Sequence, residues 1–421
     1  MSGGTLVVGA SQAGLQLAAS LRKLDNSQPI TLVGAEHYAP YQRPPLSKGV
    51  LTGEVQPADL AFQPQEFFTN AGIELVCGER IVDISLSASG LHASGIATSS
   101  TGRVFEFDRL ALTVGGRARK LTTPGHDLDG ICYLRGLDDA TAMASRLPSA
   151  EHVVVVGGGF IGLETAAAAR SVGRPVTIIE AAERLLPRAV APVVSEFFRK
   201  AHLRRGTKVL LSTGVVAFDG HGGAVTGVHL SDGRVLPADL VVVGIGLVPN
   251  TELAEQLGLQ CDGAIVVDSC ARTSNPAIVA AGDCTTLPDP LTGRGRVRLE
   301  SVQNAVEQAR VAAATLAGRP VETRTVPWFW SDQADLKLQI AGLNTDYDDY
   351  VLRGDPDTEQ FSVLYYRDDR LVAVDAVNRP ADYTAVRKAL GAGTSIAREP
   401  ARDVGRALKN LIQLEVERTT A

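Results

Sequence analysis

The sequence predicts an α/β fold with two separate parallel-sheet units, followed by a smaller α+β domain. A short apolar strand, a glycine-rich turn, an Ala- and Leu-rich helix and a second apolar strand occur once within residues 5–36. The same order recurs at residues 153–180. From about Val326 the composition changes, and alternating apolar segments such as LKLQIAGL predict an antiparallel sheet with C-terminal helices.

The length of the chain and the spacing of the two repeated units predict more than one domain. A chain of 421 residues is too long for one compact core. We expect a discontinuous first domain at 1–115 and 246–325, a second at 116–245, and a C-terminal domain at 326–421. Each of the first two would be a small parallel sheet covered by helices, the arrangement of a Rossmann-like nucleotide-binding domain.

Composition excludes several other classes of protein. The net charge of −6 argues against nucleic acid as the main partner, because phosphate binding needs a basic surface. No apolar run approaches the roughly 20 residues that cross a bilayer, and the N-terminus enters a strand without a signal segment. We therefore expect a cytoplasmic protein that is not bound to a membrane.

The five cysteines are scattered and predict reduced thiols. Their spacing never forms C-x-x-C or C-x4-C, so the chain lacks the cysteine pair that would relay electrons as a redox disulfide. Neither a nucleophile nor a metal site is expected. The cysteines are Cys77, Cys132, Cys261, Cys270 and Cys284.

The first glycine-rich turn, Gly9–Gly14, is interpreted as a dinucleotide site. Gly9 permits the tight turn from strand to helix, and Gly14 permits close packing of the helix on the strand. Ser11 occupies the position where a glycine usually lets the backbone approach a pyrophosphate, and its hydroxyl can bond phosphate. Glu36, 22 residues past Gly14, is expected to hold ribose hydroxyls. The alternative is an incidental turn.

The second turn, Gly157-Gly158-Gly159-Phe160-Ile161-Gly162, has glycine at every position of the dinucleotide fingerprint. Glu180 closes the next strand, where a carboxylate accepts hydrogen bonds from an unmodified ribose but repels the 2′-phosphate of NADP. The second site is therefore predicted to favour NADH over NADPH. Arg184 and Arg188 leave NADPH open as the alternative, although they could also meet the pyrophosphate.

Two charged segments are expected to serve a flavin at the first site. The stiff segment RPPLSK carries Arg43, directed toward phosphate, and Lys48, directed toward the flavin ring. Lys48 needs a counter-ion if it is buried, and Glu164, expected on the first turn of the second helix, is the candidate. Asp283 follows an apolar strand and a glycine, and suits a ribitol hydroxyl. The alternatives are a Pro-rich surface turn, a solvated helix glutamate and an ordinary Asp turn.

With these motifs in place, the chain resembles the NADH-dependent ferredoxin reductases of oxygenase systems. This is the putidaredoxin reductase and biphenyl-dioxygenase reductase family, within the glutathione-reductase-like flavoproteins, and the resemblance covers essentially the whole chain. The segments that carry it are RPPLSK (43–48), TVGGRAR (113–119), GGGFIGLE (157–164), GIGLVPN (244–250), TSNPAIVAAGDC (273–284), ESVQNAVEQAR (300–310), VPWFWSDQ (326–333) and AVNRP (376–380).

The resemblance implies FAD and NADH as cofactors, with Lys48 and Glu164 as the catalytic pair. Relatives often place the ribose acid of the first site one residue earlier, where this chain has Ala35. The residues implied for FAD are Gly9, Ser11, Ala13, Gly14, Glu36, Arg43, Lys48, Ile81, Arg135, Gly282, Asp283, Ser301, Val302 and Trp330. Those implied for NADH are Gly157, Gly159, Phe160, Ile161, Gly162, Glu164, Glu180, Arg188 and Gly246.

The resemblance also implies an activity. A hydride would pass from NADH to flavin N5, and single electrons would then reach a [2Fe-2S] ferredoxin that serves a cytochrome P450 or a Rieske oxygenase. A rubredoxin reductase, an NADH oxidase or a non-catalytic NADH-responsive flavoprotein is the alternative. A ferredoxin is usually acidic, but the basic run Arg199, Lys200, Arg204 and Arg205 is interpreted as a solvated helix face rather than the docking site.

Overall fold

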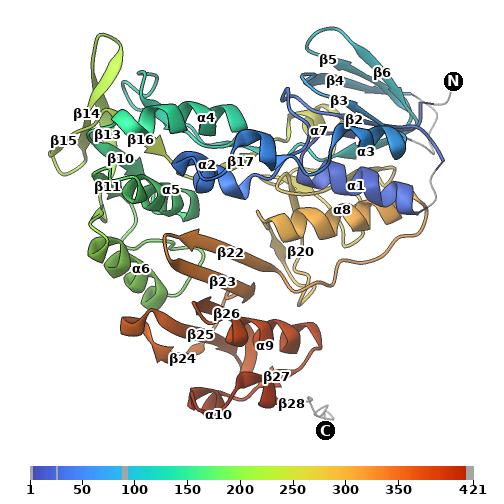
Figure 1. Cartoon of the computed structure of the whole chain (residues 1–421). Helices are drawn as coiled ribbons and strands as arrows, with labels where there is room; N and C mark the ends of the chain where they lie inside the picture. Colours follow the sequence, from blue (N-terminus) through green and yellow to red (C-terminus); the bar gives the residue numbers. More distant parts are fainter. Residues whose placement is uncertain (1–2, 25–26, 88–92, 414–421) are drawn as a thin grey trace. The chain divides into compact units, whose positions relative to one another are not determined.

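The computed structural model describes residues 3–24, 27–87 and 93–413 (Figure 1). These residues form two compact units. The first unit comprises Met1–Gln42, Leu60–Arg117 and Val248–Pro327, and the second comprises Arg43–Asp59, Ala118–Leu247 and Trp328–Ala421. The chain passes from one unit to the other within η2 (Pro57–Leu60), β8 (Gly116–Ala118) and β17 (Leu247–Pro249). It also does so just before η1 (Pro44–Ser47) and at the start of β22 (Trp328–Gln333).

The first unit contains the first predicted parallel sheet. Its strand order is β19 (Ile278–Ala280), β7 (Arg109–Leu112), β1 (Thr5–Val8), β2 (Ile30–Val33) and β3 (Ile73–Val76), with every neighbouring pair parallel. All four residues of the central strand β1 are buried, because helices and loops cover both faces of a parallel sheet. The helix α1 (Gln12–Lys23) follows β1 and lies beside α8 (Val302–Leu316) (Figure 1). The predicted first βαβ unit is thus confirmed.

Smaller elements complete the first unit. An antiparallel sheet is formed by β4 (Ile81–Leu86), β5 (Gly95–Ser99) and β6 (Val104–Phe107). A second small sheet is formed by β18 (Ile265–Val266), β20 (Thr285–Pro288) and β21 (Arg296–Val297). The short helices α3 (Gln65–Asn70) and α7 (Glu252–Gln256) also belong to this unit.

The second unit contains the other predicted parallel sheet. Its strand order is β12 (Lys208–Leu210), β11 (Val176–Ile179), β10 (Val153–Val156), β16 (Leu240–Val243) and β9 (Ile131–Tyr133), again with parallel neighbours. Here α5 (Phe160–Ser171) connects β10 to β11, which confirms the second βαβ unit. The helices around this sheet include α4 (Leu137–Arg146), η3 (Leu147–Ser149) and α6 (Pro192–Arg204). Alongside lies the antiparallel sheet of β13 (Val215–His221), β14 (Ala224–Leu230) and β15 (Val235–Pro237).

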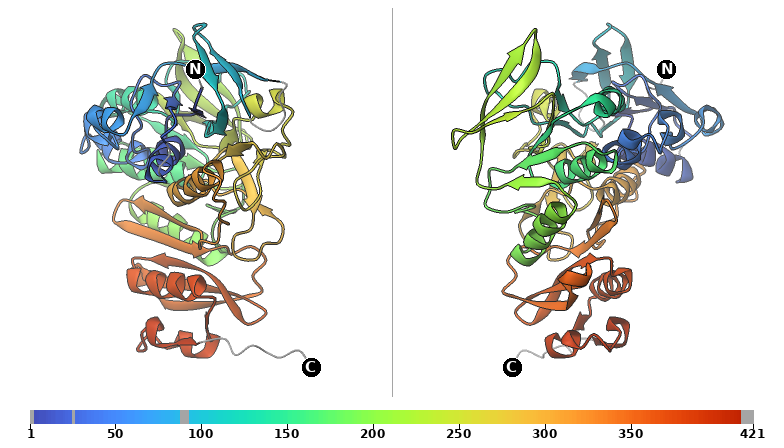
Figure 2. Two further views of the ribbon diagram at one scale, coloured as in Figure 1. Left: turned by 90° about the vertical axis from the view of Figure 1, so that its right-hand side faces the viewer. Right: turned by 60° about the vertical axis from the view of Figure 1, so that its left-hand side comes forward.

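The C-terminal part of the second unit is the predicted antiparallel sheet with helices. Its strand order is β22 (Trp328–Gln333), β23 (Leu336–Gly342), β26 (Arg370–Val377), β25 (Gln360–Arg367) and β24 (Asp349–Asp355). The helix α9 (Pro380–Gly391) packs on β26 and β23 (Figure 2). The chain then forms β27 (Ser395–Ile396), α10 (Arg398–Arg402), η5 (Leu408–Asn410) and β28 (Ile412–Gln413), while η4 (Pro356–Thr358) joins β24 to β25.

One apolar core holds the parallel and antiparallel sheets of the second unit together. Val155 and Phe198 belong to the same buried cluster as Leu338 and Tyr365 of the C-terminal sheet. Polar contacts reinforce this packing, because the Ala191 N–H donates to the Tyr365 hydroxyl at 3.1 Å. No helix among the described residues is both long and apolar enough to cross a membrane.

A buried carboxyl group in this core predicts an unusual dependence of stability on pH. Asp375 is completely buried and accepts a hydrogen bond from the Tyr365 hydroxyl. Burial raises the pKa of Asp375 from about 3.8 to about 7. The folded state therefore keeps this proton up to about pH 7, whereas the unfolded chain loses it near pH 4. The contribution of Asp375 to stability is fully present below about pH 4 and is lost as pH rises to about 7.

Asp375→Asn removes this titration. As pH rises from about 4 to 7, we therefore expect the free energy of unfolding of the variant to increase relative to that of the wild type. A shift of about three units corresponds to roughly 4 kcal/mol over that range. Above pH 7 the difference should stay constant. Urea unfolding of both proteins at pH 5, 6, 7 and 8 measures this difference in unfolding free energy. Unfolding free energies that run parallel across this range would contradict the prediction.

Candidate active site

The first glycine turn is held tightly at the end of β1. Gly9 has φ of 114°, and a Cβ at this position would lie 2.2 Å from the Thr113 carbonyl oxygen. The Thr113 hydroxyl donates to the Gly9 carbonyl at 2.9 Å. A Cβ on Gly14 would lie 2.0 Å from that same Gly9 carbonyl, so α1 packs directly on the turn. Ser11 occupies the N-cap position of α1, where an anion is favoured.

Two other residues implied for FAD lie at the ends of strands in this unit. Glu36 follows β2 and is partly buried, and its carboxylate accepts a hydrogen bond from the Tyr41 hydroxyl at 2.5 Å. Ala35, at the position where relatives often have the acid, is exposed. Ile81 begins β4 with its side chain in the apolar core, which leaves its main chain for any contact with a cofactor.

The turn at Gly282 lies against the first residues of α1. A Cβ on Gly282 would come within 3.2 Å of the Ala13 Cβ. The Gly282 N–H and the Thr285 hydroxyl both donate to Gln308 Oε1, at 2.8 and 2.9 Å. Gln308, to which no sequence pattern gave a role, is almost fully buried on α8 and so connects this helix to the turn that carries Asp283.

The start of α8 is capped within its own sequence. Ser301 is the N-cap residue, and its hydroxyl accepts the Asn304 N–H at 3.1 Å. Val302 is the first helical residue, so its main-chain N–H is among those that have no partner within the helix. Within the first unit, a helix thus begins at each of two segments implied for FAD. These are the first glycine turn, at Ser11, and the segment ESVQNAVEQAR, at Ser301.

In the second unit, the glycine turn between β10 and α5 has the form that the fingerprint predicts. Gly157 has φ of 108°, and a Cβ on Gly162 would lie 2.1 Å from the Gly157 carbonyl oxygen. Gly159, unlike Gly162, has open space around it. The nearest described atom to a Cβ added there would be the Gly244 carbonyl oxygen at 3.9 Å. This open position suits the close approach of a pyrophosphate to the main chain.

Glu180 closes the same turn from the end of β11. Its carboxylate accepts the Gly158 N–H at 2.6 Å and the Ala182 N–H at 2.7 Å. These two bonds hold the acid at the mouth of the glycine turn, where a ribose diol would meet it. Position and orientation therefore both fit the predicted ribose-binding acid.

The two arginines that kept NADPH open have different surroundings. Arg184 donates to the carbonyls of Pro187 and Val190 at 2.6 and 2.7 Å, so its role is to stabilise the loop. Arg188 is exposed, and one of its terminal nitrogens lies 3.7 Å from the position of a Cβ on Gly246. The structure thus brings together Arg188 and Gly246, which were both implied for NADH.

Lys48 and Glu164 form a close ion pair, as predicted. Lys48 Nζ lies 2.6 Å from Glu164 Oε2, and the side chains are 24% and 4% exposed. The Ser47 hydroxyl donates to the same Oε2 at 2.6 Å. From the C-terminal sheet, the Ser331 hydroxyl donates to Oε1 at 2.7 Å. The alternative of a solvated helix glutamate is wrong, and Glu164 is the fifth residue of α5 rather than part of its first turn.

The RPPLSK segment forms regular helical structure rather than a surface turn. It forms η1 (Pro44–Ser47) and continues into α2 (Gly49–Thr52), with Ser47 buried. Arg43 donates to the Arg135 carbonyl at 2.6 Å, so two residues implied for FAD meet here. The Lys48 ammonium also donates to the Pro44 carbonyl at 3.1 Å. It donates as well to the Ser47 hydroxyl oxygen at 3.3 Å, so acceptors of its own segment hold Lys48 together with Glu164.

The aromatic strand β22 presents different residues on its two faces. Phe329 contacts Phe160, with ring centroids 4.5 Å apart, and Ser331 bonds Glu164, so this face lies against α5. Because side chains alternate along a strand, Trp330 points to the other face, where its ring lies 5.6 Å from that of Trp328. Trp330 is therefore not on the face of β22 that carries the ion pair.

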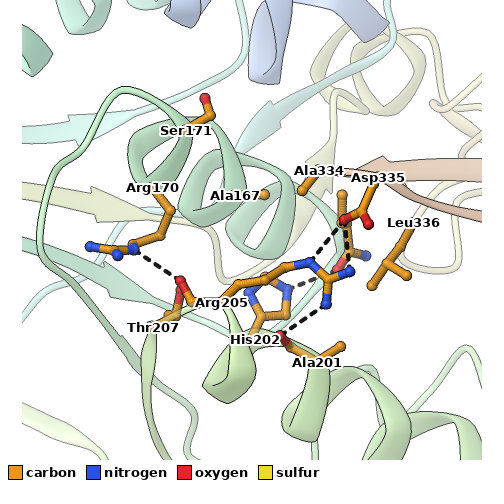
Figure 3. Close-up of a pocket in the computed structure, with 11 residues that line it drawn as sticks. Ala167, Arg170, Ser171, Ala201, His202, Arg205, Thr207, Ala334, Asp335 and Leu336 are labelled. Carbon is orange, nitrogen blue, oxygen red and sulfur yellow. Dashed lines mark hydrogen bonds and ion pairs between the residues drawn. The ribbon is translucent and has the colours of Figure 1, made fainter. Parts of the chain in front are cut away.

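A pocket of about 270 Å³ lies between α5, α6 and the β22–β23 turn (Figure 3). His202 lines it and is almost fully buried, and its Nε2 lies 2.9 Å from Gln333 Oε1. Burial lowers the pKa of His202, which favours the neutral imidazole. Figure 3 also shows Arg205 directed toward Asp335, at 2.7 Å.

The basic run on α6 is neutralised by acids of its own unit. Arg204 and Arg205 both bond Glu359, at 2.8 and 2.7 Å, and these two arginines lower the pKa of Glu359 to about 2. Arg199 pairs with Glu196 at 2.6 Å. The run therefore connects α6 to the C-terminal sheet and to itself, which agrees with its interpretation as something other than a docking site.

Comparison with known proteins identifies the family. The protein family described as "Pyridine nucleotide-disulphide oxidoreductase" matches residues 4–309. The family described as "Reductase C-terminal" matches residues 328–412. The chain belongs to this oxidoreductase family. Rhodocoxin reductase of Rhodococcus erythropolis is 44% identical over 404 residues, which cover 96% of this chain and 93% of that protein.

Solved structures agree with this assignment over nearly the whole chain. The ferredoxin reductase for the CYP199A2 system of Rhodopseudomonas palustris has a TM-score of 0.91 at 41% identity, covering 96% of this chain and 98% of that one. The covalent putidaredoxin reductase–putidaredoxin complex has a TM-score of 0.92 at 36% identity, covering 98% of each chain. The predicted glutathione-reductase-like fold is confirmed, and the protein is a ferredoxin-reductase-type oxidoreductase that uses FAD and a pyridine nucleotide.

The five cysteines distinguish this chain from family members that work through a disulfide. All five are free thiols. Cys284 is completely buried, and burial raises the pKa of its thiol to about 12, which makes it unreactive as a thiolate. Neither the spacing of the cysteines nor their state supplies a redox disulfide.

Proposed function

We propose that the protein is an NADH:ferredoxin oxidoreductase that delivers single electrons to a [2Fe-2S] ferredoxin of a P450 or Rieske oxygenase system. The observation that carries this proposal is the combination of two dinucleotide turns with a chain that has no cysteine pair. Without a disulfide relay, electrons leave the flavin directly. The names of the relatives support a ferredoxin-type acceptor, because one acts in a CYP199A2 system and another is bound to putidaredoxin.

We assign the FAD site to the first unit and to the segments that serve it. The tight glycine turn at Gly9 and Gly14 and the N-termini of α1 and α8 support this assignment. Glu36 would hold the adenosine ribose, Asp283 the ribitol, and Arg43 the pyrophosphate. In this assignment FAD is bound by residues 1–115 and 246–325, NADH by 116–245, and 326–421 is the C-terminal domain.

We assign NADH to the turn between β10 and α5. Gly159 leaves space for the pyrophosphate, and the N-terminus of α5 favours its charge. Glu180 would accept hydrogen bonds from the ribose diol and repel a 2′-phosphate, which supports NADH over NADPH. The Arg184 guanidinium donates to main-chain carbonyls of its own loop, which supports a role in holding that loop rather than in binding a 2′-phosphate.

When bound, FAD accepts a hydride from NADH and releases its electrons one at a time. The protein's part is to hold the cofactors and to set the charge around them. Lys48 would place a cation where the reduced flavin ring gains negative charge, and Glu164 would keep that cation in one position. The five free thiols support the reducing environment of the cytoplasm as the place of action.

A three-part assay tests this proposal. The purified FAD protein should be yellow and should bleach when NADH is added anaerobically. A [2Fe-2S] ferredoxin should then be reduced, with NADH consumption in air and without ferredoxin far slower. NADPH should bleach the flavin more slowly than NADH does. Slow bleaching with a long-lived charge-transfer band would favour the NADH-responsive alternative, and rapid oxygen consumption without ferredoxin would favour an oxidase.

A further inference from the structure

A buried chain of hydrogen bonds leads from the Lys48–Glu164 pair through the C-terminal sheet to α6. Glu164 Oε1 accepts the Ser331 hydroxyl at 2.7 Å, and Ser331 Oγ accepts the Gln333 amide Nε2 at 3.2 Å. Gln333 Oε1 then lies 2.9 Å from His202 Nε2. All four side chains are at least 96% buried, which strengthens these bonds relative to hydrogen bonds at the surface.

The direction of this chain follows from the chemistry of the carboxylate. A carboxylate only accepts hydrogen bonds, so the single hydroxyl proton of Ser331 is directed at Glu164. Ser331 Oγ must then accept its other bond, which turns the amide nitrogen of Gln333 toward it and the amide oxygen toward His202. An amide oxygen has no proton to give, so His202 carries its proton on Nε2. Every donor therefore points toward Glu164.

We propose that Ser331 and Gln333 are positioning residues for the Lys48–Glu164 pair, and that the C-terminal sheet thereby sets the charge at the flavin. The two carboxylate oxygens have separate tasks. Oε2 accepts hydrogen bonds from Lys48 and Ser47 of the RPPLSK segment, whereas Oε1 accepts one from Ser331 of β22. Without the Ser331 bond, Oε1 would be a buried carboxylate oxygen that has lost its donor, and the carboxyl group could turn away from Lys48.

The inference rests on the proposed reduction of the flavin by NADH, and a matched pair of serines tests it. Ser331→Ala removes the donor to Glu164. Ser362→Ala is the control, because Ser362 is also fully buried in the C-terminal sheet and also donates to a buried carboxylate, that of Asp382, at 3.1 Å. Both variants lose one hydrogen bond of the same kind, so their thermal midpoints should fall by similar amounts.

Anaerobic stopped-flow reduction by NADH separates the two roles. We expect Ser331→Ala to lower the limiting rate of flavin reduction by roughly tenfold, the value of one hydrogen bond to a charged group, with an unchanged Kd for NADH. Ser362→Ala should leave the rate unchanged. Ser331→Thr, which keeps the hydroxyl, should recover most of the rate. Gln333→Leu should lower the rate in the same direction as Ser331→Ala but by less, because it acts one bond further away.

The outcomes distinguish this inference from the proposed function. If the wild-type flavin is not reduced by NADH, the proposed function is wrong. If the wild type is reduced and Ser331→Ala reacts at the wild-type rate, only the positioning role is wrong. Equal losses of rate in Ser331→Ala and Ser362→Ala would also overturn it, because they would reflect general destabilisation of the sheet.

Discussion

Gly159→Ala is expected to raise the KM for NADH by roughly a hundredfold while the protein stays folded. Gly159 has φ of −83° and ψ of 179°, a conformation that alanine adopts without strain. The nearest described atom to the new methyl group is the Gly244 carbonyl at 3.9 Å, so the free protein has room for it. The pyrophosphate of NADH, however, must approach this main-chain position closely. Steady-state kinetics and NADH titration measure the effect.

Two further glycines serve as controls for this prediction. Gly214→Ala adds a methyl group to the same unit, and the described atoms within 4 Å of it are both on the Ser231 side chain, so neither KM nor stability should change. Gly162→Ala should behave differently again. Its Cβ would lie 2.1 Å from the Gly157 carbonyl oxygen, so stability should fall together with NADH binding. Normal NADH affinity in Gly159→Ala would show that the dinucleotide does not use this turn.

Arg353→Met is expected to destabilise the C-terminal sheet by about 3–5 kcal/mol. Arg353 is only 1% exposed and donates to the carbonyls of Ala401, Asp403 and Arg406, at 2.9, 2.5 and 2.6 Å. Its Nε also lies 3.3 Å from the buried carboxylate of Asp382. Methionine fills a similar volume but removes the guanidinium donor from these carbonyls, of which that of Asp403 keeps the Arg406 N–H, and it leaves the carboxylate paired with Arg379.

Urea unfolding, followed by the fluorescence of Trp328 and Trp330 in β22, measures this loss. Arg402→Met is the matched control in the same region, because its side chain is 53% exposed and its Nε pairs with Glu399 at 3.4 Å. We expect that control to change stability by less than about 0.5 kcal/mol. Arg353→Lys should remain strongly destabilised, since one ammonium cannot reach the partners of a guanidinium. A wild-type unfolding midpoint in Arg353→Met would contradict the prediction.

Local sequence was sufficient for the two βαβ units and for the residues at their turns. Strand, glycine turn and helix follow one another within about 30 residues, so the periodicity of apolar residues and the steric needs of glycine predict them directly. Glu180 could be placed for the same reason, because a strand end lies at a set distance from its turn. Glu164 was predicted as the partner of Lys48 from its charge and its place on the helix after the second glycine turn, but the same reasoning left it open as a solvated residue.

Long-range packing, rather than any local pattern, brings segments that are far apart in the sequence together at the Lys48–Glu164 pair. Lys48 and Glu164 are 116 residues apart, and Ser331 is a further 167 residues along the chain. The motif VPWFWSDQ contained Ser331 and Gln333, yet no local pattern assigned either of them a partner. The packing of the C-terminal sheet on α5 and α6 brings them to Glu164 and His202. Burial and partner choice depend on such long-range packing, whereas the glycine turns depend only on their immediate neighbours.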